Sequence, residues 1–365
     1  MRNVIEQIFV RIAGSPRFLR RTIGPKANLT EANRVNLAPG FPICRIINGM
    51  WQVSGAHGPI DPGLAIPNMF DYLDSGFTTW DLADHYGPAE DFIGEFRRRL
   101  RSERGHDAVA AVQSFTKWVP RPMPISRRVV EAAVDVSLRR MDVDQLDLLQ
   151  FHWWEYRDKG YLTALHHLAD LQKGKKLKHL GLTNFDTERL RLITAEGITI
   201  VSNQVQYSLV DLRPEVQMAE FSLEHSIGLL AYGTLCGGLL SERYLGRPEP
   251  SRSALNTASL LKYKQMIDAW GGWELFQELL GVLKQIADLH QVTIANVATR
   301  FTLDRPAVAG VIIGVRLGVA DHRAENIRVF DLTLFDQDRE AIESVLKRSR
   351  DLYAIIGDCG DEYRR

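Results

Sequence analysis

The stretch FTTWDLADHYG, Phe77–Gly87, places an acid and a phenol where an apolar run gives way to a loop. The residues from Phe77 to Trp80 are aromatic or β-branched, which favours a buried β-strand. Asp81 ends this run, and Tyr86 follows five residues later beside a Gly-Pro turn. A buried strand that ends on two groups able to share a proton network indicates chemistry at its carboxyl end.

Short β-like runs of this kind alternate with amphipathic segments from Arg45 onward. Such alternation implies right-handed crossovers and a parallel sheet, and eight strand–helix units favour a closed (β/α)8 barrel. The expected strands are Arg45–Trp51, Phe77–Asp81, Ala108–Lys117, Leu146–His152, His179–Thr183, Ile200–Gln206, Gly228–Tyr232 and Val308–Gly314. The expected helices are Gly63–Asp74, Ala89–Arg101, Ser126–Arg140, Gly160–Lys173, Thr187–Ala195, Pro214–His225, Trp273–His290 and Ala320–Val329.

The alternative is a doubly wound nucleotide-binding sheet, which carries GxGxxG directly after an early strand. Gly237 and Gly238 come after the seventh expected strand, too late for that fold. Two segments exceed ordinary connector length: an insertion at Ser241–Gly272, and a tail from Phe335 to Arg365 that adds one more helix. The sequence therefore predicts an α/β barrel with a long loop after the seventh strand and an extra carboxyl-terminal helix.

Composition narrows the classes of function. Lys and Arg together number 45, as do Asp and Glu, so no overall charge favours nucleic acid. The three cysteines are widely spaced and odd in number, which argues against a disulfide framework and a zinc cluster and favours a reducing compartment. No run approaches the roughly 18 apolar residues that a membrane helix requires. We expect a soluble, cytoplasmic protein that binds neither nucleic acid nor membrane.

The amino-terminal residues 1–38 differ from the rest. Up to Lys26 they carry six basic residues against the single acid Glu6, with apolar residues at near-helical spacing. Two interpretations stay open: an import sequence for a chloroplast or mitochondrion, if the chain is eukaryotic, or a frayed basic tail. We divide the chain into this extension and a barrel over residues 39–365.

Four polar residues follow apolar runs on neighbouring expected strands: Asp81 and Tyr86, then Lys117 and His152. In a barrel these strand ends converge, so the four side chains are expected to form one proton-handling site. Each one alone also has an ordinary structural explanation, as a turn cap, a rim aromatic, a snorkelling lysine or a packed histidine.

The chemistry of such a site centres on Tyr86. A free phenol has a pKa near 10, too high for efficient proton transfer at neutral pH. An ammonium beside it favours phenolate, so Lys117 is expected to lower the pKa of Tyr86, while Asp81 holds the ammonium. His152 is expected to donate a hydrogen bond that polarises a substrate oxygen.

These residues resemble the motifs of the aldo-keto reductases, which are NAD(P)H-dependent (β/α)8 oxidoreductases. The family motifs are Asp-x4-Tyr-Gly after strand two, a Lys closing strand three and a His closing strand four. The resemblance covers roughly Ile43 to Leu346, and the long loop after strand seven is similar to the branch related to potassium-channel β subunits. It implies that Tyr86 is the general acid/base of carbonyl reduction and alcohol oxidation.

The resemblance also implies cofactor contacts. GLTNF (Gly181–Phe185) and SNQVQYSLVD resemble the segments that hold the nicotinamide amide, AYGTLCGGLLS the pyrophosphate loop, and IIGVRLGVADHRAEN the adenosine-phosphate segment. The implied cofactor-binding residues are Thr183, Asn184, Gln204, Tyr232, Gly233, Thr234, Leu235, Gly237, Leu239, Gly314, Arg316, His322, Glu325 and Asn326. The chain departs from the family at Gly233-Thr234, where Ser-Pro is usual, and at Ile313 and His322.

Cofactor and substrate preferences follow from the same residues. Arg316, aided more weakly by Arg323, favours NADP(H) over NAD(H) through a 2′-phosphate. Bulky aromatic residues suggest a small apolar or aromatic carbonyl substrate, and a homo-oligomer stays open. The aromatic candidates for the pocket wall are Trp51, Trp118, Trp153, Trp154, Tyr207, Trp270 and Trp273.

Two other functions compete with a carbonyl reductase. A regulatory subunit could bind NADPH tightly, turn over slowly and report redox state to a partner protein. A metal-dependent barrel hydrolase would use histidines, but no His-x-His closes a strand and no metal site is expected.

Overall fold

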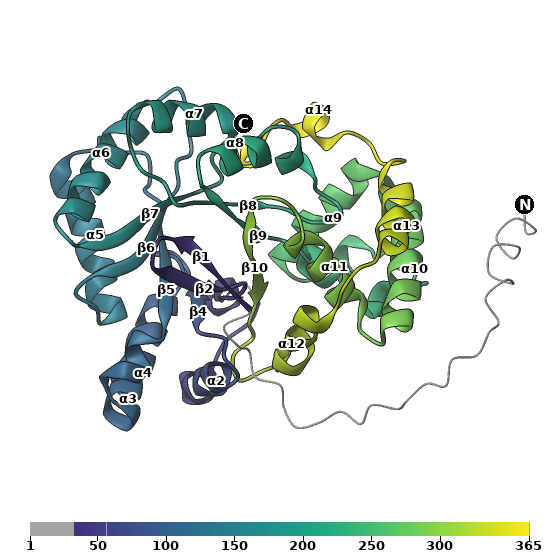
Figure 1. Cartoon of the computed structure of the whole chain (residues 1–365), viewed down its shortest axis with the longest axis horizontal. Coiled ribbons are helices and arrows are strands. Elements are labelled where there is room, and N and C mark those ends of the chain that lie inside the picture. Colours follow the sequence, from purple (N-terminus) through teal and green to yellow (C-terminus); the bar gives the residue numbers. More distant parts are fainter. Residues whose placement is uncertain (1–32, 56, 365) are drawn as a thin grey trace, which may run out of the picture.

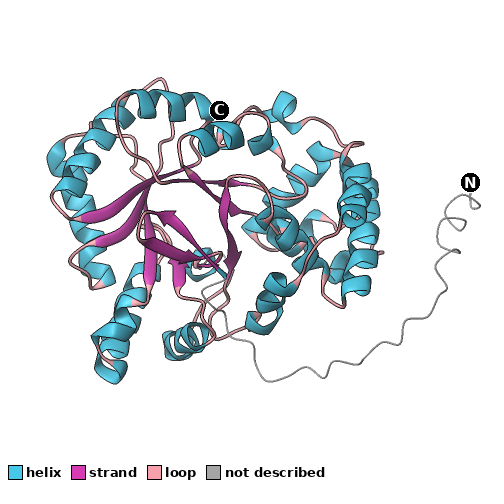
Figure 2. Ribbon diagram, viewed as in Figure 1, coloured by secondary structure: helices cyan, strands magenta, loops and turns pink. Residues whose placement is uncertain are grey.

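The computed structural model describes residues 33–55 and 57–364. Parallel strands close into a barrel in the order β10-β3-β4-β5-β6-β7-β8-β9, with helices around it (Figures 1 and 2). The strands are β3 (Ile46–Gly49), β4 (Thr79–Asp81), β5 (Gln113–Trp118), β6 (Leu146–Phe151), β7 (Leu177–Thr183), β8 (Ser202–Gln206), β9 (Gly228–Tyr232) and β10 (Val308–Gly314). The predicted (β/α)8 barrel is confirmed.

Helices follow the strands in turn, and several begin at the side-chain cap that the sequence offers. Ser126, the first residue of an expected helix, accepts a hydrogen bond from the Val129 amide as its N-cap, and Asp186 accepts one from the Arg189 amide. The helices that follow β3 to β8 are α2 (Pro62–Asp74), α3 (Ala89–Arg104) with α4 (His106–Ala110), α5 (Arg127–Met141), α6 (Gly160–Lys173), α7 (Thr187–Ala195) and α8 (Met218–Glu224).

The strands are buried along nearly their whole length, as expected when helices cover a parallel sheet. A hairpin of β1 (Arg34–Ala38) and β2 (Phe41–Cys44) precedes the barrel. Its Phe41 ring stacks on His179 at 4.4 Å and lies 5.9 Å from Phe115, among the residues of the barrel interior. The predicted boundary at residue 38 cuts through this hairpin, so folded chain begins before it. The rest of the predicted extension, residues 1–32, lies outside the described residues.

The region after β9 is more ordered than a long loop. It contains α9 (Ala258–Trp270), α10 (Gly272–His290) and α11 (Ile294–Leu303), and α12 (Arg323–Asp331) follows β10. The chain then forms α13 (Asp336–Leu346) and α14 (Leu352–Ile356). Figure 1 shows α9, α10, α11 and α13 gathered on one side of the barrel, where they share a second apolar cluster.

Two predicted elements were wrong in part. The strand expected from Ala108 begins only at Gln113, because the preceding residues form α4. The helix expected from Pro214 is split into a 3-10 turn, Arg213–Glu215, and α8, and Gln217 between them has a non-helical backbone (φ −156°). Helices α9 and α11 were not predicted. Within residues 33–55 and 57–364, no helix has the length and apolar character needed to cross a membrane.

Candidate active site

The four residues singled out by the sequence meet at the carboxyl end of the barrel. Asp81 closes β4, Lys117 lies near the end of β5 and His152 follows β6 directly, and all three are nearly fully buried. Tyr86 comes from the loop after β4 and is half-buried. Neighbouring parallel strands thus bring these four side chains together at the carboxyl end of the barrel.

Asp81 and Lys117 form a buried ion pair at this end of the barrel. The Lys117 Nζ donates to Asp81 Oδ2 at 2.6 Å and to the Leu82 carbonyl at 2.7 Å. The other carboxylate oxygen accepts from Gln150 Nε2 at 2.9 Å and from Gln204 Nε2 at 2.7 Å. Burial lowers the pKa of Lys117, and Asp81 opposes this by favouring the ammonium. A charge so enclosed is held firmly in place.

Tyr86 meets this pair through its ring. Lys117 Nζ lies 4.8 Å from the ring centroid, a cation–π distance, while it donates its hydrogen bonds to Asp81 and Leu82. Burial, followed by the negative charge of Asp81, raises the pKa of Tyr86 well above its ordinary value. This direction differs from the expected lowering, because burial disfavours the charged phenolate and the negative charge of Asp81 adds to that effect. Tyr86 is therefore a protonated phenol at neutral pH.

His152 has its tautomer selected by the backbone. Its Nδ1 lies 3.1 Å from the Thr183 carbonyl, which can only accept, so Nδ1 carries the proton. Burial lowers the pKa of His152 to about 4, so the ring is neutral at pH 7 and Nε2 holds a lone pair. Nε2 is buried without a partner among the described residues. It faces the site as an acceptor, whereas the sequence argument expected a donor.

The residues assigned to the nicotinamide amide lie beside this cluster. Asn184 follows β7 in the left-handed region (φ 58°), and its Oδ1 accepts from the Tyr232 hydroxyl at 2.8 Å. Thr183 Oγ1 donates to the Gln204 carbonyl at 3.2 Å. Gln204 Nε2 is turned inward to Asp81 and to Gln150 Oε1, so its amide donor is already used. The assignment to the nicotinamide amide therefore fits Thr183 and Asn184 better than it fits the amide donor of Gln204.

The loop after β9 is a tight, glycine-rich turn. Gly233, Cys236, Gly237 and Gly238 all have positive φ, and the backbone amides of Cys236 and Gly238 donate to carbonyls within the loop. A Cβ at Gly233 would lie 2.4 Å from the Tyr263 hydroxyl, so only glycine fits there. Nearby, Thr234 Oγ1 is buried without a partner among the described residues. An orphaned hydroxyl in a glycine-rich loop fits a pyrophosphate. Leu235 and Leu239 belong to this loop and pack into the second apolar cluster.

The adenosine end lies on β10 and the start of α12. A Cβ at Gly314 would lie 2.1 Å from the Gln52 side chain, so the chain passes close there. Arg316 is exposed and forms no ion pair within the described residues. Arg323, by contrast, is held by Asp321 at 2.7 Å. Of these two arginines, Arg316 is the one left available to a phosphate.

The other three predicted adenosine contacts, His322, Glu325 and Asn326, are linked to one another. His322 Nδ1 lies 3.0 Å from Glu325 Oε2, and the Asn326 amide donates to the His322 carbonyl at 2.8 Å. His322 and Glu325 are exposed, so they are accessible to a ligand but partly occupied by each other.

Two of the seven aromatic candidates border the site. The Trp51 ring lies 5.0 Å from Tyr86, and the Trp154 ring lies 4.4 Å from His152 at a steep angle. The other five are buried in the apolar core: Trp118, Trp153, Tyr207, Trp270 and Trp273.

Sequence reasoning missed Gln150, two residues of α9 and one residue of the carboxyl-terminal tail. Gln150 stands two residues before His152 on the same strand, and the period of two in a strand places both on the same face. That signal was present in the sequence. Lys262, Tyr263 and Tyr363 also reach the site, but they come from the unpredicted α9 and from the tail, where no local pattern marks them.

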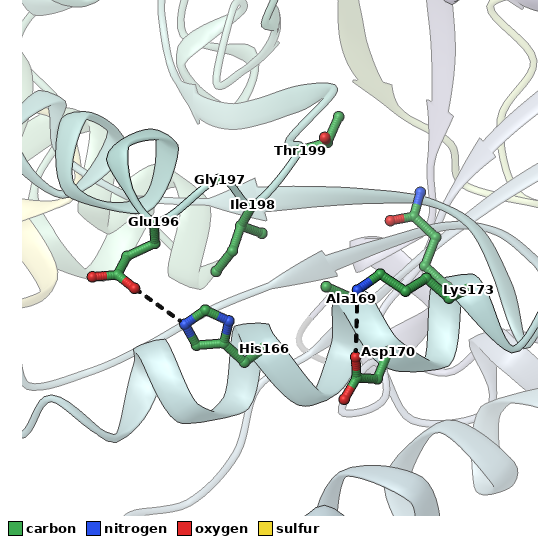
Figure 3. Close-up of a pocket in the computed structure, with 9 residues that line it drawn as sticks. His166, Ala169, Asp170, Lys173, Glu196, Gly197, Ile198 and Thr199 are labelled. Carbon is green, nitrogen blue, oxygen red and sulfur yellow. Dashed lines mark hydrogen bonds and ion pairs between the residues drawn. The ribbon is translucent and has the colours of Figure 1, made fainter.

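A separate cavity of about 410 Å³ lies elsewhere on the barrel. It is lined by α6 and by the loop before β8, and therefore lies toward the amino ends of the strands. Figure 3 shows His166 turned to Glu196 and Lys173 turned to Asp170 along its wall, at 3.3 and 3.7 Å. None of the predicted site residues lines this cavity.

The pattern of the Aldo/keto reductase family matches residues 45–347. The chain therefore belongs to the aldo/keto reductase family, whose members are NAD(P)H-dependent oxidoreductases, and the resemblance drawn from the sequence is confirmed. The solved structure of a glycerol dehydrogenase from Gluconobacter oxydans superposes with a TM-score of 0.72 at 22% identity, over 87% of this chain and 96% of that one. It shows the shared fold.

Curated relatives share about a quarter of their residues with this chain. The aldo-keto reductase YhdN of Bacillus subtilis is 24% identical over 85% of this chain and 92% of its own length. The L-glyceraldehyde 3-phosphate reductase of Escherichia coli K12 is 26% identical over 79% of this chain and 84% of its own. Flagellar radial spoke protein 5 of Chlamydomonas reinhardtii is 28% identical over 61% of this chain, which spans about half (49%) of that longer protein.

Proposed function

We propose that the protein reduces an aldehyde or ketone to an alcohol with NADP(H), and catalyses the reverse oxidation, with Tyr86 as the general acid/base. The observation that carries this proposal is the protonated Tyr86 beside the buried Lys117–Asp81 pair. A phenol whose pKa is raised gives up its proton only to a strongly basic oxygen. A carbonyl oxygen that is gaining negative charge is such an acceptor.

When bound, the nicotinamide supplies the hydride that adds to the carbonyl carbon. Tyr86 then delivers its proton to the carbonyl oxygen, and the phenolate that forms is stabilised by Lys117 across the 4.8 Å cation–ring contact. Asp81 keeps the ammonium charged and fixed. His152 accepts the hydrogen bond of the new hydroxyl at Nε2, since its proton lies on Nδ1. The neutral histidine thus recognises the alcohol rather than the carbonyl.

The cofactor contacts follow the family positions. Thr183, Asn184 and the Gln204 carboxamide oxygen would hold the nicotinamide amide, and Tyr232 would lie against the ring. The loop from Gly233 to Leu239 would receive the pyrophosphate, supported by its positive-φ backbone and the orphaned Thr234 hydroxyl. Gly314, Arg316, His322, Glu325 and Asn326 would border the adenosine phosphate.

We assign NADP(H) rather than NAD(H) on the strength of Arg316. Its guanidinium is exposed and unpaired within the described residues, and it matches a 2′-phosphate in charge and geometry. Arg323 no longer supports the assignment, because Asp321 occupies it.

Trp51 and Trp154 border the site, and they favour a small carbonyl substrate with an apolar or aromatic body. The relative named L-glyceraldehyde 3-phosphate reductase extends the range to be tested to small phosphorylated aldehydes. We also propose that a basic extension precedes the β1–β2 hairpin and the barrel, and that it serves as an import segment or a tail.

Replacing Tyr86 with Phe tests this function. Loss of positioned acid catalysis is expected to reduce turnover on the order of 10²–10⁴-fold, while the affinity for NADPH stays the same. Stopped-flow measurement of hydride transfer from bound NADPH to a panel of aldehydes gives the rate, and fluorescence titration gives the affinity. Unchanged turnover in Tyr86→Phe would remove Tyr86 from this role. Slow hydride transfer to every aldehyde in the wild type would favour a redox-sensing subunit instead.

A further inference from the structure

The last residues of the chain are packed onto the nicotinamide end of the site. Gly360 has φ 91°, and a Cβ there would lie 2.1 Å from the Asn184 carbonyl oxygen. The backbone of the tail therefore touches Asn184 as closely as glycine allows.

Buried polar contacts hold this tail in place. Arg213, 2% exposed, donates to the Asp358 carbonyl at 3.1 Å and pairs with Glu362 at 3.0 Å. Asp358 Oδ2 accepts from the Thr187 amide at 2.8 Å, at the start of α7. A buried pair with excellent geometry is costly to break, so the tail is a fixed part of the site rather than a loose end.

Tyr363 and Lys262 continue from this anchored tail to the residues assigned to the cofactor. The Tyr363 hydroxyl lies 3.0 Å from the Tyr232 hydroxyl and accepts a hydrogen bond from Lys262 Nζ. Tyr232 in turn donates to Asn184 Oδ1 at 2.8 Å. Four polar groups from α9, the tail, β9 and β7 are thus joined in one row.

The direction of each hydrogen bond in this row is determined. An ammonium can only donate, so Tyr363 accepts from Lys262. Tyr232 spends its single proton on Asn184, so Tyr363 must be the donor to Tyr232. Donors and acceptors then alternate without conflict from Lys262 to Asn184, and such aligned bonds strengthen one another.

We propose that Lys262 and Tyr363 are positioning residues for the nicotinamide. Through Tyr232 they engage the Asn184 carboxamide oxygen and leave its NH2 to donate to the nicotinamide amide. The inference rests on the proposed function, since it acts on the cofactor residues assigned there. Within the described residues Asn184 Nδ2 has no partner, which is what a donor kept for a ligand requires.

The protonation of Tyr232 fits this arrangement. Burial, followed by the neighbouring Tyr363, raises the pKa of Tyr232 well above its ordinary value. Tyr232 therefore keeps the proton that it donates to Asn184 at any pH at which the protein would work.

The test compares two ligands on three variants. NADPH contains the nicotinamide, whereas adenosine 2′,5′-bisphosphate contains only the adenosine-phosphate part. Tyr363→Phe and Lys262→Met each break the row, and we expect each to weaken NADPH binding roughly 5- to 10-fold. Binding of the fragment should stay unchanged. Tyr353→Phe is the matched control, because Tyr353 lies in the same tail but bonds to Gln217, outside the row.

Isothermal titration gives both affinities for each protein. The double variant Tyr363→Phe/Lys262→Met should lose little more than either single variant, because the residues act as one row. Equal weakening of both ligands would indicate a general structural effect and would overturn the proposal, as would tighter NADPH binding, which would mean that Tyr363 competes for the ring's place. Unchanged NADPH affinity in Tyr363→Phe would overturn the positioning role of Lys262 and Tyr363 and leave the proposed function in place. A wild type that fails to bind NADPH overturns the proposed function with it.

Discussion

Two tyrosine–lysine pairs lie at the carboxyl end of the barrel, and they are built differently. In the first, Lys117 is bonded to the Asp81 carboxylate and meets the ring of Tyr86 at 4.8 Å. In the second, Lys262 also lies over its tyrosine ring, 4.4 Å from the centroid of Tyr363, but in addition it donates directly to the Tyr363 hydroxyl. Among the described residues, Lys262 has no carboxylate within ion-pair distance, and its side chain is half-buried.

The difference shows what a carboxylate does to a neighbouring ammonium. Burial, together with the negative charge of Asp81, keeps the phenol beside Lys117 protonated, so Tyr86 serves as an acid. Lys262 lacks such a partner and acts on its phenol through the hydrogen bond itself. One pair is arranged to move a proton, and the other to hold a ring and an amide in place.

The largest expected effect comes from removing each ammonium in turn. Lys117→Met leaves Asp81 buried and unpaired, which should cost about 3–5 kcal/mol of unfolding free energy. Turnover should fall on the order of 10²–10³-fold, because the phenolate loses its cation. Lys262→Met, at a half-buried site, should change stability by less than about 1 kcal/mol. Urea denaturation and steady-state turnover measure both variants, and equal losses in the two would contradict the contrast between the pairs.

The next prediction concerns His152 and the dependence of stability on pH. The His152 ring lies 6.4 Å from that of Tyr363, and the residue follows the strand that carries Gln150. The unfolded chain binds a proton at this histidine below pH 6.5, but the folded chain does so only below about 4. Stability should therefore fall as the pH is lowered through this interval, by about 3 kcal/mol in full.

Urea midpoints between pH 7 and 4 measure this loss. His152→Gln should remove its share of the slope, since a glutamine does not titrate. An identical slope in that variant would mean that His152 is not held neutral by the fold.

The sequence was sufficient for the first pair and insufficient for the second. Asp81, Lys117 and His152 each close an apolar run, so strand ends alone brought them together. Their hydrogen-bond partners could not be predicted in this way. The inward orientation of the Gln204 side chain and the tautomer of His152 depend on groups that approach across the barrel. The direction of the Tyr86 pKa was also missed, because burial outweighed the nearby cation.

The second pair had no local signal at all. Tyr363 meets Tyr232 across 131 residues of sequence, and Lys262 meets Tyr363 across 101. Such contacts are set by how α9 and the tail pack on the barrel, and periodicity within a segment does not report them. Family motifs did not help either, because they cover the strand ends and not this tail.

The smallest expected effect concerns the glycine that seats the tail. Gly360→Ala and Gly197→Ala both place a Cβ on a residue of positive φ, at 91° and 73°, which costs about 1 kcal/mol each. At Gly360 that Cβ would also meet the backbone oxygen of Asn184 at 2.1 Å, whereas at Gly197 nothing lies within 4 Å. Gly360→Ala should therefore lower the melting temperature further and weaken NADPH binding, while Gly197→Ala leaves NADPH affinity unchanged. Equal behaviour of the two alanine variants in thermal unfolding and titration would mean that the tail does not rest on Asn184, and the second pair would then lose its support.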